Sequence, residues 1–259
     1  MKKFLKDYWL YLCLVLVVLL GFLGYVNGYR FGPYGLPVKA GLLVVADVPS
    51  QTTVYLDNIR RHYVEATSTS MYVTGTTHSV IVDAPGYQPW NELVTIPEGE
   101  TLTLHPLLVR QQILEKKVEG ADIAPAWQAI WKTVLPTKET PLLTSDGCVS
   151  IYTLGNRIVA EAVQNDTCVP PPYLCTADAG CAPVIVFEPI ETIKDVLVYP
   201  NRTDALLVSS GNKVYVLEID PRDPRFFAPL VRGTGVRVAP WKEHSIVVSD
   251  GASLREIEL

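Results

Sequence analysis

The chain has 259 residues, of which 48% are hydrophobic and 19% charged, so it can bury a core and is not a solvated, disordered polymer. Its formal net charge is −5, and no run of Lys or Arg occurs beyond the first six residues, which argues against nucleic acid as a partner. This length fits one large domain or two modest ones, and we expect two.

An uncharged apolar run lies near the start of the chain. Residues 8–26 carry no charge, and their number is close to the roughly 20 apolar residues that cross a bilayer core. The run therefore favours a single transmembrane helix. A cleaved signal peptide is the alternative, but the run is longer than an apolar region of about 7 to 15 residues, and no A-x-A-like cleavage site follows it.

The residues that flank this run predict its orientation. Three lysines precede it, so the positive-inside rule keeps the N-terminus in the cytoplasm and places the later domains outside. Tyr8 and Trp9 at one end and Tyr25 at the other are the expected interface anchors. We therefore expect a signal-anchored, single-pass protein of the cell membrane that contacts the lipid bilayer through this helix. Residues 1–29 would form the cytoplasmic tail and helix, and residues 30–39 a stalk.

Short β-branched runs separated by turn residues begin at Ala40 and predict a small β-sandwich over residues 40–109. Asp57-Asn58 and Pro85-Gly86 lie between these runs, where backbone chemistry favours a reversal of the chain. The expected strands are Gly41–Val48, Thr53–Leu56, Met71–Thr74, His78–Val82 and Leu93–Ile96.

The order of landmarks in this region resembles the PEGA domain. The segment Val54–Asn58 matches the family's "V-x-L-D-G" hairpin, His78–Val82 its "G-x-H-x-V-x-V" strand, and Gly86-Tyr87 its "GY" turn. The resemblance implies one complete copy. The sequence departs from the family at Asn58, where Gly is usual, and it lacks the "G-x-T-P" element in Ile59–Thr69. Because Asn tolerates positive φ, we expect the hairpin to survive.

A helical linker is expected over residues 110–140. Within Gln111–Lys138, apolar residues recur with helical spacing, Pro125 suits a first turn, and Pro136 ends the pattern. Buried aromatics are the common case, so we expect Trp127 and Trp131 to pack against a β-domain. A partner-facing aromatic patch is the alternative.

The last part of the chain contains a repeat. Pro200–Ile219 aligns without a gap on Pro240–Leu259, with Leu207-Val208-Ser209 over Val247-Val248-Ser249 and Gly211 over Gly251. Each copy predicts a β-hairpin. A third copy is expected at Leu143–Leu154, with its Ser145-Asp146-Gly147 turn, followed by a strand over Arg157–Ala162. A period of 40 residues is typical of four-stranded propeller blades.

This region resembles TolB-like propeller repeats in Val198–Pro200, Asn212–Leu217 and Leu254–Leu259. The resemblance implies a propeller-like domain over residues 141–259, and the chain as a whole is expected to be mainly β. The region is long enough for only three or four blades. A six-bladed ring would therefore be truncated, completed by another subunit, or replaced by an open stack.

Cys148, Cys168, Cys175 and Cys181 all fall in the part of the chain expected outside the cytoplasm, where disulfides form. Three pairings are possible, and we favour Cys148–Cys168 with Cys175–Cys181. A zinc site is the alternative, disfavoured because the spacing C-x6-C-x5-C lacks a close C-x2-4-C pair.

The sequence contains no G-x-S-x-G elbow, H-E-x-x-H pair, P-loop or G-x-G-x-x-G, so no catalytic residue, cofactor or metal ligand is expected. Glu218, Asp220 and Asp223 near Arg222 and Arg225 could form a calcium or carbohydrate site, although ion pairs in a solvated loop are the simpler interpretation. His78 is expected to pack in a strand.

These observations predict a membrane-anchored, non-enzymatic binding or structural protein of the cell envelope. Its expected partner is a surface protein or a cell-wall glycan, and a second subunit is a possible partner that completes the propeller. The alternative is a hydrolase or lyase acting on extracellular glycans, in which carboxylates from several blades would converge.

Overall fold

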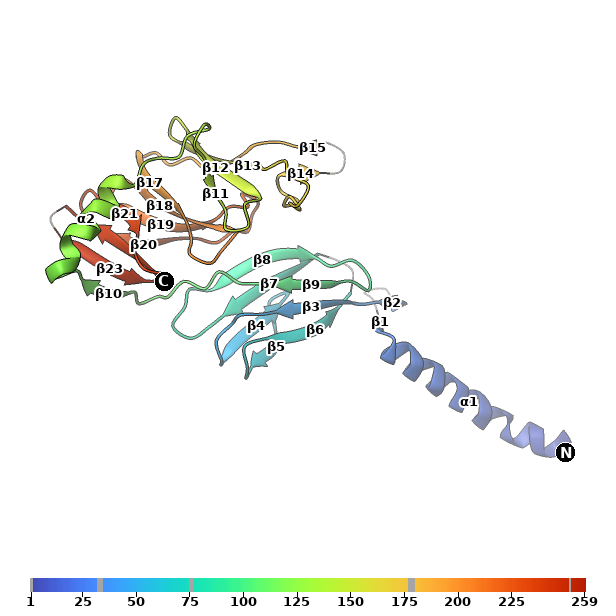
Figure 1. Cartoon of the computed structure of the whole chain (residues 1–259). Helices are drawn as coiled ribbons and strands as arrows, with labels where there is room; N and C mark the ends of the chain where they lie inside the picture. The colour runs from blue at the N-terminus through green and yellow to red at the C-terminus, as the bar shows by residue number, and fades with distance from the viewer. Residues whose placement is uncertain (1, 32–34, 75–76, 177–179, 252) are drawn as a thin grey trace. The chain divides into compact units, whose positions relative to one another are not determined.

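The structure, a computed structural model, describes residues 2–31, 35–74, 77–176, 180–251 and 253–259, with only the backbone described for residues 2–7, 10, 60 and 61. The described chain is mainly β-structure (Figure 1). It divides into two compact units. The first is formed by Met1–Pro85 with Glu92–Pro106, and the second by Gly86–Asn91 with Leu107–Leu259.

Helix α1 (Lys2–Val26) forms where the apolar run is, but the expectation that it spans a bilayer is corrected. No helix in the described residues is long and apolar enough to cross a membrane. Tyr8, Trp9 and Tyr25 are exposed on α1, and their interface role stays a prediction.

The segment that was expected to form a stalk contains a two-stranded β-ribbon, which follows α1 in the chain. Strands β1 (Tyr29–Phe31) and β2 (Pro37–Lys39) pair antiparallel. The guanidinium of Arg30 lies over the ring of Tyr25 at 4.0 Å and over the ring of Tyr72 at 4.5 Å. Arg30 therefore joins the end of α1 to a strand of the sandwich through two cation–π contacts.

The first unit contains the expected β-sandwich. One sheet has the order β6-β3-β9, and the other has the order β5-β4-β7-β8. Strands β3 and β4 alternate buried with half-buried residues, as strands with one face on a core do. The strands are β3 (Gly41–Val45), β4 (Thr52–Leu56), β5 (Ile59–Val64), β6 (Thr69–Val73), β7 (Thr77–Asp83), β8 (Trp90–Thr95) and β9 (Thr101–Leu104).

The hairpin at Asp57-Asn58 forms without the usual glycine. Both residues have positive φ, 53° and 62°, as a type I′ turn requires. Strand β5 follows directly and fills the region where the "G-x-T-P" element is missing. Strands β5 and β9 were not expected from the sequence, and β9 pairs parallel with β3.

The second unit contains, within its described residues, three four-stranded sheets. The first sheet has the order β11-β12-β13-β16, the second β17-β18-β19-β20, and the third β10-β23-β22-β21. A short ribbon of β14 (Cys175–Thr176) and β15 (Gly180–Cys181) lies in the loop between β13 and β16. The strands of the first sheet are β11 (Leu142–Leu143), β12 (Val149–Leu154), β13 (Arg157–Ala162) and β16 (Val184–Phe187). Those of the second sheet are β17 (Ile193–Val198), β18 (Ala205–Ser210), β19 (Lys213–Glu218) and β20 (Phe227–Arg232). The third sheet consists of β10 (Leu114–Lys117), β21 (Arg237–Pro240), β22 (Ser245–Ser249) and β23 (Leu254–Glu258).

Apolar side chains fill the space between the first and second sheets. Ile151 and Ile158 of the first sheet pack in one cluster with Leu206 and Leu217 of the second. The other face of the second sheet is buried too, and Ser209 on that face donates to the carbonyl of Val236, just before β21, at 2.6 Å. The second sheet is thus buried on both faces.

The third sheet contains one strand from the beginning of the segment Leu107–Leu259 and three from its end. Strand β10 comes before the other sheets in the chain, yet it pairs antiparallel with β23, with Leu114 opposite Glu258. Helix α2 (Ile123–Lys132), which follows the 3₁₀ turn η1 (Gly120–Asp122), covers one face of this sheet. The described sheets do not close into a ring, so the resemblance to a propeller is not confirmed.

Candidate functional site

Helix α2 is held on the third sheet by a small apolar core. Ala126 and Ile130, four residues apart, are 0% and 2% exposed and pack against a cluster that contains Val247 and Leu254. The helix ends at Lys132, and the amide and hydroxyl of Thr133 donate to the carbonyl of Ala129. One face of α2 is therefore fixed, and the opposite face carries the candidate site.

The two tryptophans of α2 divide between core and surface. Trp127 is partly buried against the core of the third sheet, whereas Trp131 is 70% exposed and Val134, just beyond the helix, is 76% exposed. The two indole rings are stacked, with centroids 5.8 Å apart and planes at 22°. Packing against a β-domain thus holds for Trp127, and the alternative of an outward aromatic patch describes Trp131.

Two further exposed apolar residues lie on turns of the first sheet. Leu154, the last residue of β12 before the turn to β13, is 65% exposed, and Ile190, between β16 and β17, is 104% exposed. Asn156 ties these turns together because its amide donates to the carbonyls of Pro189 and Glu191 at 2.8 and 3.1 Å. Both turns are therefore at the same end of the first sheet.

The segment after α2 reaches this end as well. The carbonyl of Pro136 accepts hydrogen bonds from the amide and the hydroxyl of Thr153, both at 2.8 Å. The exposed Leu154 follows Thr153 in the chain, and the exposed Val134 lies two residues before Pro136. We call the four exposed residues Trp131, Val134, Leu154 and Ile190 the apolar rim. Large exposed apolar side chains on a folded unit are typical of binding surfaces.

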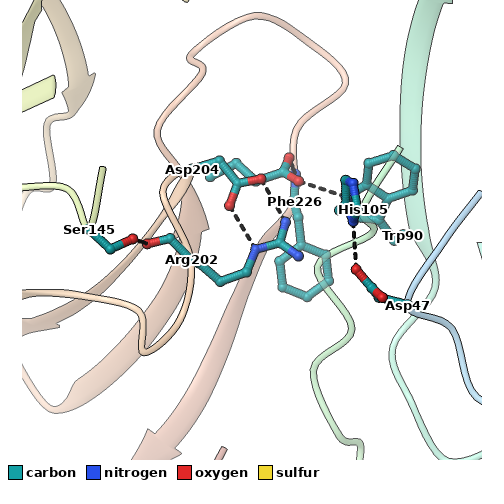
Figure 2. Close-up of polar contacts among 8 residues, drawn as sticks. Asp47, Trp90, His105, Ser145, Arg202, Asp204 and Phe226 are labelled. Atoms are coloured by element: carbon teal, nitrogen blue, oxygen red, sulfur yellow. Dashed lines mark hydrogen bonds and ion pairs between the residues drawn. The ribbon is translucent and has the colours of Figure 1, made fainter. Parts of the chain in front are cut away.

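Charged loops lie at the opposite ends of the strands. Glu218, the last residue of β19, accepts a hydrogen bond from the indole Nε1 of Trp90 at 2.6 Å and another from the amide of Phe226 at 2.7 Å (Figure 2). Burial raises the pKa of the Glu218 carboxyl, and these two hydrogen bonds oppose the rise. Glu218 thus anchors Trp90, which is 3% exposed, within the second unit.

The other charges of these loops are paired locally. Arg202 binds the carboxylate of Asp204 through two nitrogens at 2.7 and 2.6 Å, and the hydroxyl of Ser145 donates to the carbonyl of Arg202 at 3.0 Å (Figure 2). Asp220 is paired with Arg222 in the same way. These contacts support the interpretation as solvated ion pairs.

The acidic residues proposed for calcium do not gather into a metal site. Glu218 accepts hydrogen bonds from two N–H donors, Asp220 is paired with Arg222, and Arg225 donates to the carbonyl of Val186 at 2.6 Å. Over the part of the chain that the structure describes, no group of three His, Cys, Asp or Glu side chains could hold a metal ion.

A second buried carboxylate joins the second and third sheets. Asp195 of β17 is fully buried, and Arg237 of β21 donates to it through two nitrogens at 2.7 to 2.9 Å. The amide of Val238 donates to the same carboxylate at 2.9 Å. Burial raises the pKa of the Asp195 carboxyl against these donors. These bonds link β17 of the second sheet to β21 of the third.

The four cysteines of the second unit form the favoured pairs, Cys148–Cys168 and Cys175–Cys181. The first disulfide ties the start of β12 to the loop after β13, and the second joins directly opposite residues of β14 and β15. All four sulfurs are thereby used, which argues against the zinc alternative. Cys13 in α1 is a free thiol.

In the sandwich, the histidines serve the fold. His78 of β7 is 8% exposed, its Nδ1 lies 2.8 Å from the carboxylate of Asp57, and its Nε2 lies 2.9 Å from the carbonyl of Thr74. His105 lies 2.6 Å from the carboxylate of Asp47 at the surface (Figure 2). His78 therefore links its strand to the Asp57-Asn58 turn, as expected from a packing role.

A shallow depression of about 450 Å³ lies on the third sheet beside β10. Its charged groups bind one another, since Glu256 accepts from Lys242 at 3.0 Å and from Ser245 at 3.3 Å. The depression is lined by Leu114, Glu115, Lys116, Lys242, Glu243, His244, Ser245, Glu256 and Glu258.

A family comparison tests the resemblance that was drawn from three features of the first unit. These features are the alternating strands, the Asp57-Asn58 hairpin and the His78 strand. Residues 40–112 match the PEGA domain. The match confirms the resemblance seen in the sequence and extends it three residues past Val109. A comparison with curated proteins finds no match. The PEGA domain, together with two disulfides, fits an extracellular or envelope-associated protein.

Proposed function

We propose that this chain is a non-enzymatic binding protein of the cell envelope that works outside the cytoplasm and holds a partner protein at the apolar rim. The two disulfides support the compartment, because such bonds persist in oxidising spaces. The PEGA domain supports the envelope assignment.

The observation that carries the proposal is the exposure of the apolar rim on an otherwise well-packed unit. Trp131 is 70% exposed while Ile130, its neighbour in α2, is 2% exposed, so the helix is firmly seated and its outer face is uncovered. Trp is enriched at the centres of protein interfaces, where it contributes a large share of the binding energy.

A glycan partner is the second candidate. The stacked rings of Trp127 and Trp131 form a flat aromatic surface, which could receive the apolar face of a sugar ring. The aliphatic side chains Val134, Leu154 and Ile190 favour protein over sugar, because they offer no hydrogen-bond donor or acceptor to a ligand rich in hydroxyl groups.

A glycan-acting hydrolase or lyase is a weaker proposal. Such an enzyme needs two carboxylates that converge on an open site. The two buried carboxylates with raised pKa, Glu218 and Asp195, are each bound by several donors of the chain itself. Neither belongs to the depression beside β10.

The test uses the full chain in its native cells, with a photo-crosslinking amino acid at position 131. The matched control carries the same group at position 169, because Val169 is 88% exposed and lies outside the apolar rim. We expect one protein adduct from position 131 and none from position 169. Trp131→Ala with the crosslinker at position 134 should weaken that adduct, whereas Val169→Ala should not.

Three results would overturn the proposal. One is equal labelling from positions 131 and 169, and another is an adduct that Trp131→Ala leaves unchanged. The third is a glycan adduct at position 131, which would replace the protein partner by the second candidate.

A further inference from the structure

The two disulfides of the second unit differ in how much of the fold surrounds them. Cys148 is 8% exposed and immediately precedes β12, and its carbonyl accepts a hydrogen bond from the amide of Val163 at 2.9 Å. The other pair lies in the ribbon of β14 and β15, where Cys175 is half-buried and Cys181 is exposed. Disulfides that a thiol can reach are the labile ones, so the second pair is the candidate for exchange.

The ribbon stands apart from the three four-stranded sheets. Strands β14 and β15 form a sheet of two strands, in which Cys175 lies opposite Cys181 and Thr176 lies opposite Gly180. A two-stranded ribbon of this length has little stability of its own. The Cys175–Cys181 bond therefore holds the ribbon closed, and among the described strands none outside the ribbon pairs with it.

The base of the ribbon is anchored without the disulfide. Leu174 is 3% exposed and belongs to the apolar cluster between the first and second sheets. Its amide donates to the carbonyl of Pro171 at 3.0 Å, and its carbonyl accepts from the amide of Ala182 at 2.9 Å. Because these contacts use no sulfur, opening the disulfide leaves the base in place. The two cysteines are only 6 residues apart, so closing the loop again costs little entropy.

The two sulfurs of the ribbon are not equivalent. Cys175 packs against the apolar cluster between the first and second sheets, whereas both residues of β15, including Cys181, are exposed. In thiol–disulfide exchange a thiolate attacks one sulfur of the disulfide and the other sulfur leaves, and access decides which sulfur is attacked. The geometry therefore favours attack at Cys181 and departure of Cys175.

The first disulfide is shielded by burial and by charge. The amide of Cys148 donates to the carboxylate of Asp146 at 3.1 Å, and the hydroxyl of Thr144 donates to the same oxygen at 2.6 Å. These bonds hold a negative charge beside Cys148, where it repels an incoming thiolate. Cys148–Cys168 is thus a poor target for the reagent that can reach Cys181.

We propose that Cys175–Cys181 is a thiol-exchange site that takes a dithiol protein as its reductant, while Cys148–Cys168 stays closed. A thiolate of the reductant forms a bond to Sγ of Cys181, the Cys175–Cys181 bond breaks, and Cys175 leaves as a thiolate that takes up a proton. The second thiol of the reductant then attacks the mixed disulfide and releases Cys181. The reductant loses two electrons and ends as a disulfide, and both cysteines end as thiols. The site uses none of the residues of the apolar rim and adds a reaction to the proposed function.

The first experiment compares the two disulfides in the folded full-length chain. The chain is treated with dithiothreitol for increasing times, free thiols are blocked with N-ethylmaleimide, and peptide mass spectrometry measures the reduced fraction of each pair. We expect Cys175–Cys181 to be reduced at least about tenfold faster than Cys148–Cys168, with no change in tryptophan fluorescence. In denaturant, where burial is lost, the two rates should agree within about threefold.

A trapping experiment identifies the sulfur that is attacked. A thioredoxin-like protein whose second active-site cysteine is replaced by serine cannot complete the exchange and stays bound as a mixed disulfide. We expect the wild-type chain to carry this adduct on Cys181. The double variant Cys148→Ser with Cys168→Ser should still form the adduct, whereas Cys175→Ser with Cys181→Ser should not.

Four results would overturn the proposal. Equal reduction rates of the two disulfides in the folded chain would show that access does not distinguish them. A fluorescence change that accompanies reduction of Cys175–Cys181 would show that this bond supports the core. The other two are an adduct on any cysteine other than Cys181 and the lack of any adduct on the wild-type chain.

Discussion

Strands β3 and β4 of the sandwich alternate buried with half-buried residues, whereas β18 and β22 in the second unit are buried at every position. A sandwich has two layers, so each sheet keeps one side toward solvent. The middle of a stack has no such side. The difference shows that the number of layers around a strand can be read from its pattern, with alternation in one unit and continuous apolar runs in the other.

Burial on both faces also changes how polar residues are tolerated. Ser209 and Ser210 of β18 are 0% and 1% exposed, and each hydroxyl donates to a backbone carbonyl outside its own sheet, of Val236 and Glu191 respectively. A buried hydroxyl without such a partner would cost about 1 to 3 kcal/mol. The polar residues of the stack therefore link its layers instead of facing solvent.

The largest effect is expected from a cavity in the stack. Leu207→Ala should lower the free energy of unfolding of the second unit by about 2 to 5 kcal/mol, because Leu207 is fully buried in β18. Tryptophan fluorescence during chemical denaturation measures this, since all tryptophans except Trp9 lie in the second unit.

Leu43→Ala in β3 is the matched control, since Leu43 is also 0% exposed but lies in the sandwich. It should leave the fluorescence transition in place and shift the transition seen by circular dichroism. Equal shifts of the fluorescence transition in both variants would show that the two units unfold as one and would remove the basis of the comparison.

Removing the disulfides should lower the free energy of unfolding of the second unit and not that of the sandwich, because both disulfides belong to the second unit. The residues of Cys148–Cys168 are 20 apart and those of Cys175–Cys181 are 6 apart. From loop-closure entropy, replacing the first pair by Ser should cost about 3 kcal/mol and replacing the second about 2 kcal/mol. Urea denaturation followed by fluorescence ranks the two variants, and the reverse order would contradict the argument.

A smaller, pH-dependent effect is expected at Glu218. Burial raises the pKa of its carboxyl above 4.5, so the folded unit holds this proton more tightly than the unfolded chain does. The resulting stabilisation is complete below the unfolded pKa and is lost as the pH rises through the folded pKa. The stability of wild type relative to Glu218→Gln should therefore fall as the pH rises from below the unfolded pKa to above the higher folded pKa.

Denaturation at several pH values tests this expectation. Glu188→Gln is the control, because Glu188 is 52% exposed and its ion pair with Arg157 contributes little. A relative stability of wild type that rises with pH would show that the donors to Glu218 outweigh its burial.

The smallest effect is expected at the hairpin of the sandwich. Asn58 has a φ of 62°, which Gly adopts without strain and Asn adopts at little cost. Asn58→Gly should change the free energy of unfolding by about 0.5 kcal/mol or less. Circular dichroism melting of the full chain measures it, and a loss above about 1 kcal/mol would mean that the Asn58 side chain has a role beyond the turn.

The sequence predicted the elements whose residues show a pattern of their own. Strands β4 and β7, the Asp57-Asn58 turn and the face of α2 with Ala126 and Ile130 all follow from local spacing. Strand β10 could not be predicted, because its Leu-Glu-Lys-Lys segment is exposed at every position and is a strand only through its pairing with β23. Strand β5 lies at a sheet edge, where its basic residues interrupt the apolar alternation.

The two aligned copies of the repeat are hairpins of the second and third sheets. The third copy, which lies in the first sheet, was assigned to the wrong turn. Gly155-Asn156-Arg157 in the first sheet corresponds to Gly211-Asn212-Lys213 in the second, and both glycines have positive φ, 61° and 58°. The Ser145-Asp146-Gly147 turn that marked the third copy instead joins β11 to β12. The disulfide-bonded loop between β13 and β16 lengthens the first sheet's repeat and hides the correspondence.

The candidate site was predicted only in part. The spacing of four residues places Trp127 and Trp131 on one side of α2, but it does not say which of them the third sheet covers. Leu154 and Ile190 gave no signal, since a single apolar residue beside a turn is ordinary in sequence. The bonds of Asn156 to Pro189 and of Thr153 to Pro136, which hold these segments, join parts of the chain that are distant in sequence.

The pairing of β10 with β23 has a consequence for the synthesis of the chain. Leu114 lies opposite Glu258, so the third sheet cannot be completed until the residues up to Glu258 have left the ribosome. Until then α2 lacks Val247 and Leu254, so Ala126 and Ile130 lack two of the buried residues that they pack against. A nascent chain that pauses within the second sheet would expose this helix, and it is at that stage that a chaperone would be needed.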